Sequence, residues 1–239
     1  MHQTTSTGGE PYITEVPPND LSRLQPQLKL IDLKQGTVLH EAGAPLEYVY
    51  FPTTGMVSIL AIMRTGDAIE TAVIGREGVV GGSIGSEGSL AFGQSMVQIP
   101  GSALRVGAKP FLKVLEESNG LRSLVNRYQS VVLLQAQQSA ACHAFHHVDA
   151  RLCRWLLHAS DATESDIVNL TQEFLSHMLG VRRTSVTLIA HTLQKTGLIR
   201  YSRGKIQILD RPGVEECACE CYDVLRGEID KALSGDRTG

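Results

Sequence analysis

Residues 170–195 read LTQEFLSHMLGVRRTSVTLIAHTLQK, and this stretch decides the fold of the C-terminal third. Thr171 suits a helix N-cap, and apolar residues at helical spacing follow it. Gly180 permits a tight turn, after which a second helix is predicted to start at Arg182 or Arg183. Four residues of that second helix share one face at i, i+3, i+4 and i+7 spacing: Val186, Ile189, Ala190 and Leu193.

The opposite face of the second helix is predicted to stay free of the core. At about 100° per residue, that face carries Thr184, Thr187, Leu188, His191 and Lys195. Two helices joined by a glycine turn form the helix-turn-helix arrangement, whose second helix can enter the major groove of DNA. Helix pairs of this kind also occur in proteins that never bind DNA. The prediction of DNA binding therefore also depends on the charge of this region and on the segment that follows the second helix.

A basic hairpin follows the helix pair. Ile199–Tyr201 and Ile206–Leu209 flank the turn Ser202-Arg203-Gly204-Lys205, where a glycine supplies the positive φ that a tight hairpin needs. The charge is also uneven along the chain, because residues 171–211 carry +5 whereas the whole chain carries −3. A compact basic module on an acidic body is typical of a protein that binds the phosphate backbone.

The N-terminal half differs from the C-terminal part in its composition and in the pattern of its apolar segments. Residues 1–20 are rich in Thr, Gly and Pro and are predicted to form a flexible arm. Short β-prone segments follow, among them Tyr48–Phe51 and Met56–Met63, and glycines separate them. This spacing predicts an antiparallel sandwich or barrel over residues 21–118.

A long helix is predicted between the two halves, over residues 119–147, because residues 121–147 contain no Pro or Gly. We interpret its heptad pattern as the seam of a homodimer; the alternative is a single amphipathic helix lying on its own domain. The remaining residues, 148–239, form the C-terminal domain, which ends in one helix over Val214–Leu233. The predicted dimerisation residues are Leu121, Leu124, Tyr128, Val131, Gln135, Gln138, Cys142 and Phe145.

Three stretches together resemble the Crp/Fnr family: Leu170–Ile189, Leu193–Ile206 and Asp149–Leu157, with a looser likeness from about Leu24 to Leu233. The resemblance implies an α+β protein with an N-terminal jelly-roll sensor of the cyclic-nucleotide-binding type, a dimerisation helix and a winged helix-turn-helix. It also implies a bacterial transcription regulator that binds double-stranded promoter DNA as a homodimer and works with RNA polymerase.

The residues predicted to contact DNA lie on the two helices and the wing: Thr171, Arg182, Arg183, Thr184, Ser185, Thr187, Leu188, His191, Arg203 and Lys205. Family members that read the well-known half-site place Arg and Glu at the positions of Arg183 and Thr184, and a second Arg at Leu188. Only Arg183 matches, and its guanidinium can bridge guanine O6 and N7. Leu188 can only pack on a thymine methyl, so we expect a different base sequence.

The sensor also departs from the nucleotide-binding members. Their phosphate cassette carries Gly-Glu and then Arg-Ser or Arg-Thr, whereas this chain has Gly81-Gly82-Ser83 and Gly93-Gln94-Ser95. The acid and the arginine are therefore missing, and cyclic AMP is not expected to bind because nothing neutralises its phosphate. An uncharged or weakly polar effector, a protein partner and regulation by abundance are the alternatives. The candidate effector residues are Gly81, Gly82, Ser83, Gln94 and Ser95.

The cysteines are interpreted as incidental, and no metal or other cofactor is predicted. On a continuous helix Cys217 and Cys221 share a face while Cys219 points elsewhere, a spacing unlike zinc or iron–sulfur motifs. Cys142, His143, His146 and His147 form a second group, in which His143 and His147 at i, i+4 could hold a metal between subunits; ordinary polar roles are favoured. No cysteine precedes Cys142, which excludes the N-terminal iron–sulfur cluster of the oxygen-sensing members.

No signal peptide or membrane-length apolar run is present, so a cytoplasmic protein is expected, with no membrane partner. His40 is the only histidine of the sensor block, and no phosphate-binding or nucleophile motif occurs, so an enzyme is not expected. Two alternative functions remain open beside the DNA-binding regulator: a small-molecule-binding jelly-roll module with vestigial DNA binding, and a jelly-roll enzyme.

Overall fold

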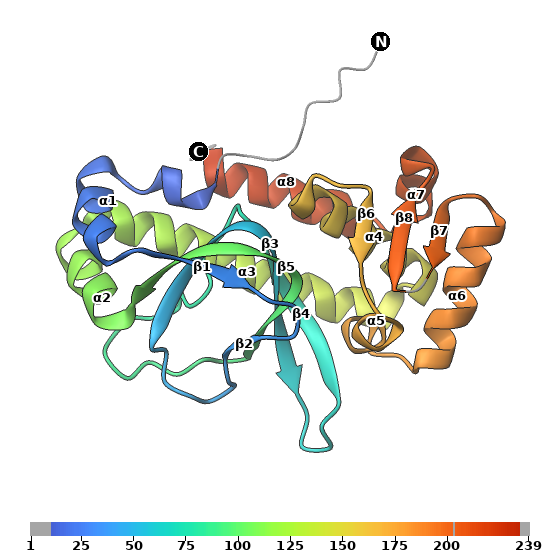
Figure 1. The fold of residues 1–239 in the computed structure, drawn as a ribbon, viewed down its shortest axis with the longest axis horizontal. Helices are drawn as coiled ribbons and strands as arrows, with labels where there is room; N and C mark the ends of the chain where they lie inside the picture. Colours follow the sequence, from blue (N-terminus) through green and yellow to red (C-terminus); the bar gives the residue numbers. More distant parts are fainter. Residues whose placement is uncertain (1–10, 203, 235–239) are drawn as a thin grey trace, which may run out of the picture.

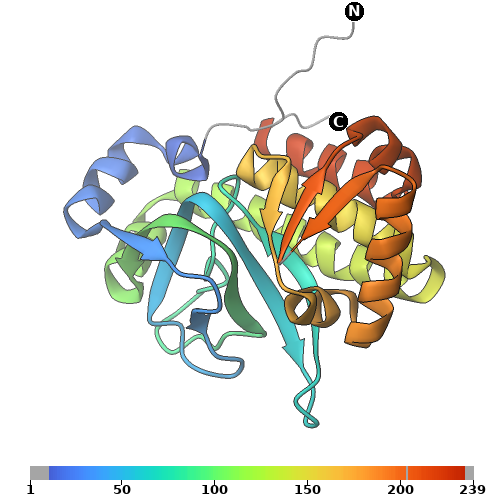
Figure 2. The same ribbon diagram turned by 45° about the vertical axis from the view of Figure 1, so that its right-hand side comes forward.

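The structure, a computed structural model, describes residues 11–202 and 204–234. A β-rich domain and a helical domain lie at the two ends of a long helix, α3, which runs along the molecule (Figures 1 and 2). Along the chain the elements are η1 (Tyr12–Glu15), α1 (Pro18–Leu24), η2 (Gln25–Gln27), β1 (Lys29–Leu33), β2 (Val38–His40), β3 (Tyr48–Ile62), β4 (Ala68–Ile74), β5 (Gln94–Gly107), α2 (Ala108–Glu117), α3 (Asn119–Phe145), α4 (Val148–Thr163), β6 (Ile167–Asn169), α5 (Gln172–Leu179), α6 (Arg183–Lys195), β7 (Ile199–Ser202), β8 (Lys205–Ile208), α7 (Arg211–Cys217) and α8 (Cys221–Ser234). None of the helices in the described part of the chain has the length and apolar character needed to cross a bilayer.

The N-terminal domain is an antiparallel sheet with the strand order β1–β5–β3–β4, and β2 also pairs with β5. Its two long central strands are bent, and their register shifts three times between Pro52 and Val57. The segments Tyr48–Phe51 and Met56–Met63, predicted as separate strands, are therefore joined into β3 (which ends at Ile62), because the residues between them continue to pair with β5. The α+β fold class, with an antiparallel N-terminal domain, long helices and a C-terminal helix-turn-helix, is confirmed.

The predicted flexible arm is wrong over residues 11–20. These residues form η1 and the start of α1, and Tyr12 is 1 % exposed. The Tyr12 hydroxyl donates to the carbonyl of Leu124 (2.9 Å) and the ring lies 5.2 Å from that of Tyr128. An aromatic side chain with a buried hydrogen bond ties this segment to α3, a contact that composition does not reveal. Residues 1–10 lie outside the described residues.

Helix α3 buries the face that was predicted to pair two subunits. Six of the predicted dimerisation residues pack inside their own chain and are at most 4 % exposed: Leu121, Leu124, Tyr128, Val131, Gln135 and Cys142. Gln138 is half-buried and donates to Cys221 Sγ (3.0 Å), whereas Phe145 is exposed. These six positions therefore pack as the alternative of a helix lying on its own domain requires, and the homodimer seam stays a prediction only at Gln138 and Phe145. The physical reason is that a heptad pattern indicates which face of a helix is buried, but not whether that face packs against its own chain or against a second subunit.

The two domains share a packed and hydrogen-bonded junction. Met56 and Ile99 of the sheet belong to the same core as α4 of the helical domain. Beside them Glu70 of β4 is buried, and Ser58 of β3 donates a hydrogen bond to its Oε2 atom (2.5 Å). Burial raises the pKa of Glu70 to about 7, and the Ser58 hydroxyl and the Arg154 guanidinium only partly oppose that rise.

Glu70 should make the stability of the protein depend on pH. Since its folded-state pKa is higher than its ordinary value of 4.5, the folded state binds more protons between pH 4.5 and 7. Its contribution is therefore greatest at low pH and falls as the pH rises through about 7. We expect Glu70→Gln, which keeps the shape without the charge, to be more stable than wild type at pH 8, by up to about 3 kcal/mol, and similar to it at pH 5. Urea unfolding at both pH values measures this difference. Exposed Glu87→Gln is the matched control, and an equal change for both variants would contradict the role of burial.

Candidate nucleic-acid interface

Helix α5 begins at a side-chain cap. The Thr171 hydroxyl accepts a hydrogen bond from the backbone N–H of Phe174 (3.3 Å), which satisfies one of the free N–H groups of the first turn. At the other end, the buried Arg151 of α4 donates from Nη2 to the carbonyl of Leu179. A cation at a helix C-terminus is favourable, so both ends of α5 are fixed.

Gly180 makes the turn between the two helices. Its φ is +60°, a left-handed conformation that favours glycine, and the Val181 N–H donates back to the carbonyl of Ser176 (3.0 Å). A Cβ at this position would lie 2.9 Å from Ile69 Cδ1 of β4, so the turn also packs against the sheet domain. The glycine that the sequence marked as a turn residue is thus favoured by its left-handed conformation, and the neighbouring Ile69 side chain leaves little free space beside it.

Helix α6 presents one buried face and one free face. Val186, Ala190 and Leu193 lie in the core, and Ile189 is half-buried. All the residues of the predicted outer face are exposed: Thr184, Thr187, Leu188, His191 and Lys195. Arg182 and Arg183 at the start of the helix are exposed too, while Ser185 is half-buried. The helix is therefore anchored on one side and accessible on the other, which is the geometry that groove reading needs.

A small sheet stands beside the helix pair in the order β6–β8–β7. The Leu170 N–H donates to the carbonyl of Gly204 (2.7 Å), and the Tyr201 N–H donates to Gln194 Oε1 at the end of α6 (2.8 Å). These bonds hold the β7–β8 hairpin, the wing, against both ends of the helix pair. Lys205 on the wing is exposed; Arg203, which was also predicted to contact DNA, lies outside the described residues.

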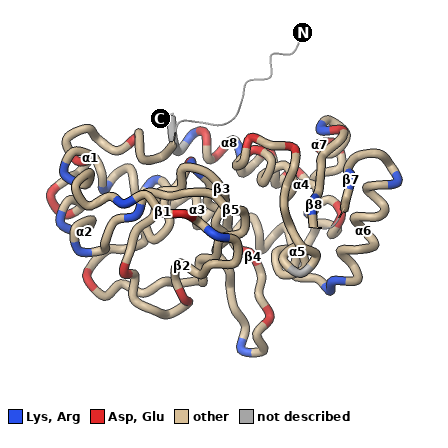
Figure 3. Tube along the Cα trace, viewed as in Figure 1, with Lys and Arg blue, Asp and Glu red and all other residues tan. Residues whose placement is uncertain are grey.

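The positive charge of this domain is concentrated on α6 and the wing. Lys and Arg lie at both ends of α6, and its sequence contains no Asp or Glu (Figure 3). Arg211, which contributed to the predicted +5, is different: it pairs with Asp161 (2.6 Å) and Glu215 (2.9 Å). These hydrogen bonds raise its pKa against the opposing effect of burial, and the residue binds α7 to α4. The charge count over residues 171–211 thus overstates the charge that faces solvent.

Comparison with known proteins agrees with this geometry. A profile of the Crp-like helix-turn-helix domain matches residues 150–217. The transcriptional regulator SdrP of Thermus thermophilus is 27 % identical over 196 residues, which are 79 % of this chain and 93 % of that protein. Among solved structures, a transcriptional regulator of the CRP/FNR family, also from Thermus thermophilus, has a TM-score of 0.63 at 22 % identity, covering 80 % of this chain and 98 % of that one. These comparisons support a Crp/Fnr-type regulator: residues 150–217 match the Crp-like helix-turn-helix domain, and the relative SdrP is a transcriptional regulator.

A second solved relative broadens the fold comparison. The c-di-GMP-responsive global regulator CLP of Xanthomonas campestris has a TM-score of 0.66 at 17 % identity and covers 81 % of this chain and all of its own. At that identity the likeness concerns the fold. The helix-turn-helix profile and the relative SdrP indicate a Crp/Fnr-type DNA-binding transcription regulator, as the resemblance noted in the sequence implied.

The N-terminal domain contains a small cavity of about 90 Å3. Four of the predicted effector residues line it: Gly81, Gly82, Ser83 and Ser95. Gln94 lies outside it and donates to Glu41 (2.8 Å). His40 also lines the cavity, with Nε2 2.9 Å from the carbonyl of Tyr48 and Nδ1 3.4 Å from Ser95 Oγ.

No charged group of the described chain is available in this cavity to bind a phosphate. Its lining contains no Arg or Lys. Burial lowers the pKa of His40, although the hydrogen bond to Tyr48 opposes that shift, so the ring is neutral at pH 7. The volume is also small beside the roughly 300–1,000 Å3 of pockets that enclose drug-sized ligands.

The structure also brings together a cluster of three cysteines and a histidine, which the spacing in the sequence did not predict to lie close together. Cys142 and His146 at the end of α3 lie beside Cys219 and Cys221, which connect α7 and α8. Spacing gave no signal because one continuous helix was predicted over Val214–Leu233. The chain instead forms α7 and α8, and Ala218 between them is extended.

We expect the purified regulator to bind neither cyclic AMP nor cyclic GMP, because the cavity offers neither a counter-charge nor sufficient volume. Isothermal titration calorimetry of each nucleotide into the protein should give no heat beyond dilution. A micromolar dissociation constant, accompanied by a rise in DNA affinity, would contradict this expectation and place the phosphate cassette elsewhere. Cyclic di-GMP, titrated in the same way, extends the test to a larger nucleotide.

Proposed function

We propose that this regulator binds an inverted-repeat promoter site as a homodimer, with α6 in the major groove and the wing on the phosphate backbone. The exposed face of α6 carries this proposal: it is free of acidic residues, while its opposite face is fixed in the core of the domain. A two-fold dimer presents two such helices, so half-sites about one helical turn apart follow from the symmetry. Its place of action is then the bacterial cytoplasm, together with RNA polymerase.

Arg183 is the residue that we assign to direct base reading. It is exposed at the start of α6, and its Nε donates to Gln172 Oε1 of α5 (3.2 Å). This bond leaves both terminal nitrogens of the guanidinium for a guanine, which accepts two hydrogen bonds at O6 and N7. Contacts to the phosphate backbone of DNA are assigned to Arg182, Thr171, Ser185 and Lys205.

The rest of the exposed α6 face, including Thr184, Thr187 and His191, is assigned to the groove. Leu188, with 69 % of its surface exposed, offers only apolar contact to a thymine methyl. The operator is therefore expected to differ from the half-site read by members with a second arginine there.

Replacing Arg183 by Ala should weaken specific binding by about 1–3 kcal/mol and relax discrimination at one base pair in each half-site. The loss arises because a bidentate contact to guanine has no substitute in alanine. Selection of bound sequences from random DNA gives the operator, and fluorescence anisotropy on all single-base variants then measures the discrimination.

The matched control is Arg122→Ala, an exposed arginine at the far end of α3. It should leave affinity and discrimination unchanged. A uniform loss over all base variants for Arg183→Ala would assign that residue to phosphate. Weak, sequence-independent binding by the wild type would favour the alternative, a small-molecule-binding module with vestigial DNA binding.

The homodimer needs a face of α3 other than the buried one. Leu133 is 60 % exposed, and three small residues continue its stripe along the helix at spacings of three and four: Ala136, Ala140 and Ala144. Ala140 and Ala144 are exposed and Ala136 is half-buried. A stripe of small residues lets two helices approach closely, and a second copy of α3 is the partner that a two-fold axis supplies. We therefore place the dimer contact on this stripe.

Charged replacement on this stripe should separate the subunits. The variant Leu133→Arg/Ala140→Arg is expected to sediment as a monomer, because two unpaired guanidinium groups would be buried on each helix. The matched control is Leu30→Arg on β1, a leucine that is 70 % exposed but lies in the sheet. Persistence of the dimer in the double variant, measured by sedimentation velocity, would place the interface on another surface.

A further inference from the structure

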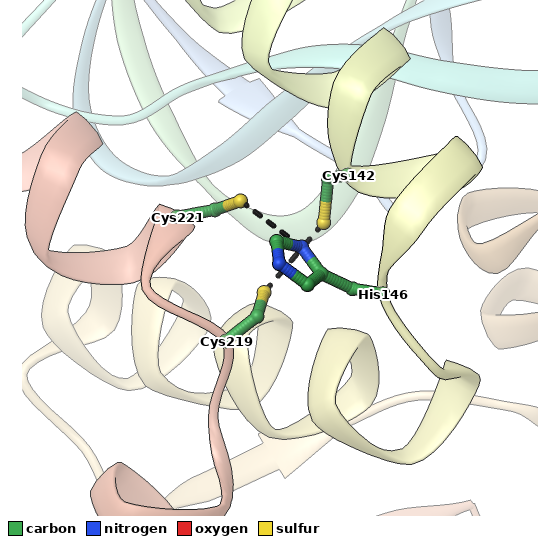
Figure 4. A group of neighbouring side chains, drawn as sticks. All are labelled: Cys142, His146, Cys219 and Cys221. Carbon is green, nitrogen blue, oxygen red and sulfur yellow. Dashed lines mark hydrogen bonds between the residues drawn. The ribbon is translucent and has the colours of Figure 1, made fainter.

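Three thiols and an imidazole meet where α3 ends and the α7–α8 connection passes beside it (Figure 4). Cys142 lies in the last turn of α3 and His146 is the residue that caps it, whereas Cys219 lies in the connection and Cys221 is the first residue of α8. One ligand atom of each lies within 4.8 Å of those of the other three. We propose that these four side chains form a tetrahedral Cys3His site for Zn2+, separate from the DNA-binding surface and from the cavity of the N-terminal domain.

The distances suit a tetrahedral ion. With zinc–sulfur bonds of about 2.3 Å and zinc–nitrogen bonds of about 2.0 Å, neighbouring ligand atoms lie roughly 3.5–3.8 Å apart. Cys142 Sγ and Cys219 Sγ are 3.6 Å apart, and Cys221 Sγ and His146 Nδ1 are 3.4 Å apart. Two of the pairs thus already have the separation of tetrahedral ligands, and all four atoms lie within 4.8 Å of one another. A set of three thiolates and one imidazole is typical of a structural zinc site, which has no open position for substrate.

Groups around the cluster support its ligands. Nδ1 is the ring nitrogen of His146 that faces the thiols, at 3.4 Å from Cys221 Sγ, and the other nitrogen, Nε2, lies on the side of the Glu220 carboxylate at 3.9 Å. Gln138 Nε2 donates to Cys221 Sγ (3.0 Å), and a donor to sulfur stabilises a thiolate. The Cys219 N–H is bonded to the carbonyl of Ala150 in α4 (3.4 Å), so the connection that carries two ligands is itself held in place.

The surroundings also match the charge that a filled site would have. Zn2+ with three thiolates and a neutral imidazole carries one negative charge. Arg151 and Arg154 of α4 are buried, and both interact electrostatically with Cys142. A buried anion with a cation nearby avoids much of the cost of desolvation. All three cysteines are buried, with Cys142 fully inaccessible, so water and oxidants are kept from the sulfurs.

A metal here would join three parts of the chain. The ligands link the end of α3 to the start of α8, and Ala150 brings in the start of α4, which leads into the helix-turn-helix. The ion would therefore fix the angle at which the C-terminal domain leaves α3. This consequence rests on the proposed DNA binding, whereas the site itself can be tested with no DNA present.

The experiment measures metal content on the full chain. Protein expressed with zinc and purified without chelator should carry about one Zn2+ per chain by mass spectrometry of the metal. Replacement by Co2+ should give the visible and near-ultraviolet absorption of tetrahedral cobalt bound to thiolate, a signature that adventitious surface binding lacks. Cys219→Ser should lose the stoichiometric metal, and chelator should lower the melting temperature of wild type but not of this variant.

Cys217→Ser is the matched control, because Cys217 is an exposed cysteine two residues before the cluster. It should keep its metal, its cobalt spectrum and its sensitivity to chelator. Since the cobalt spectrum is recorded on wild type, a variant that fails to fold does not decide the question. Absence of stoichiometric metal together with no cobalt–thiolate absorption would overturn the proposal. Recovery of iron with acid-labile sulfide, or of a Cys142–Cys219 disulfide in metal-free protein, would overturn it as well.

Discussion

The burial of one complete face of α3 is the constraint on which the rest of the structure depends. From Leu121 to Cys142 this face is covered by the sheet, by the N-terminal segment and by α8. A single helix thereby serves as part of the core of the N-terminal domain and as the connection to the DNA-binding domain. Because interiors are densely packed, neither end of this helix can shift without disturbing side chains at the other.

The same constraint keeps the cavity of the N-terminal domain apart from the exposed face of α6. The cavity receives Gln129 and Val132 from the first half of α3, whereas α6 and the wing lie beyond its far end. Between them, β4 contacts both α3 and α5, and Gly180 of the helix-turn-helix packs on Ile69. Packed residues of β4 and α3 therefore lie between the cavity and the DNA-binding domain.

The sequence predicted those features that local chemistry controls. The cap at Thr171, the left-handed Gly180 and the two faces of α6 follow from residue type and helical period alone. Three features escaped because they depend on distant partners. Tyr12 is held by a hydrogen bond to Leu124, which is distant in the sequence. The apolar face of α3 packs against the sheet of its own chain. Arg211 forms an ion pair with Asp161. The cysteine cluster was not predicted, and the reason is local. The helix break at Ala218 brings Cys219 and Cys221 onto the same side, and no Pro or Gly in the sequence marks that break.

Gln135 has a consequence for solubility. Strand β4 is the last in its sheet, so the outer N–H and C=O groups of its backbone have no strand partner. The side-chain amide of Gln135 occupies both groups of Val73: it accepts from the N–H (2.9 Å) and donates to the carbonyl (3.1 Å). One glutamine on α3 thus takes the place that a strand from another molecule would need. An exposed edge is where β-proteins aggregate, and at Val73 a buried amide occupies that edge while also fixing the helix to the sheet.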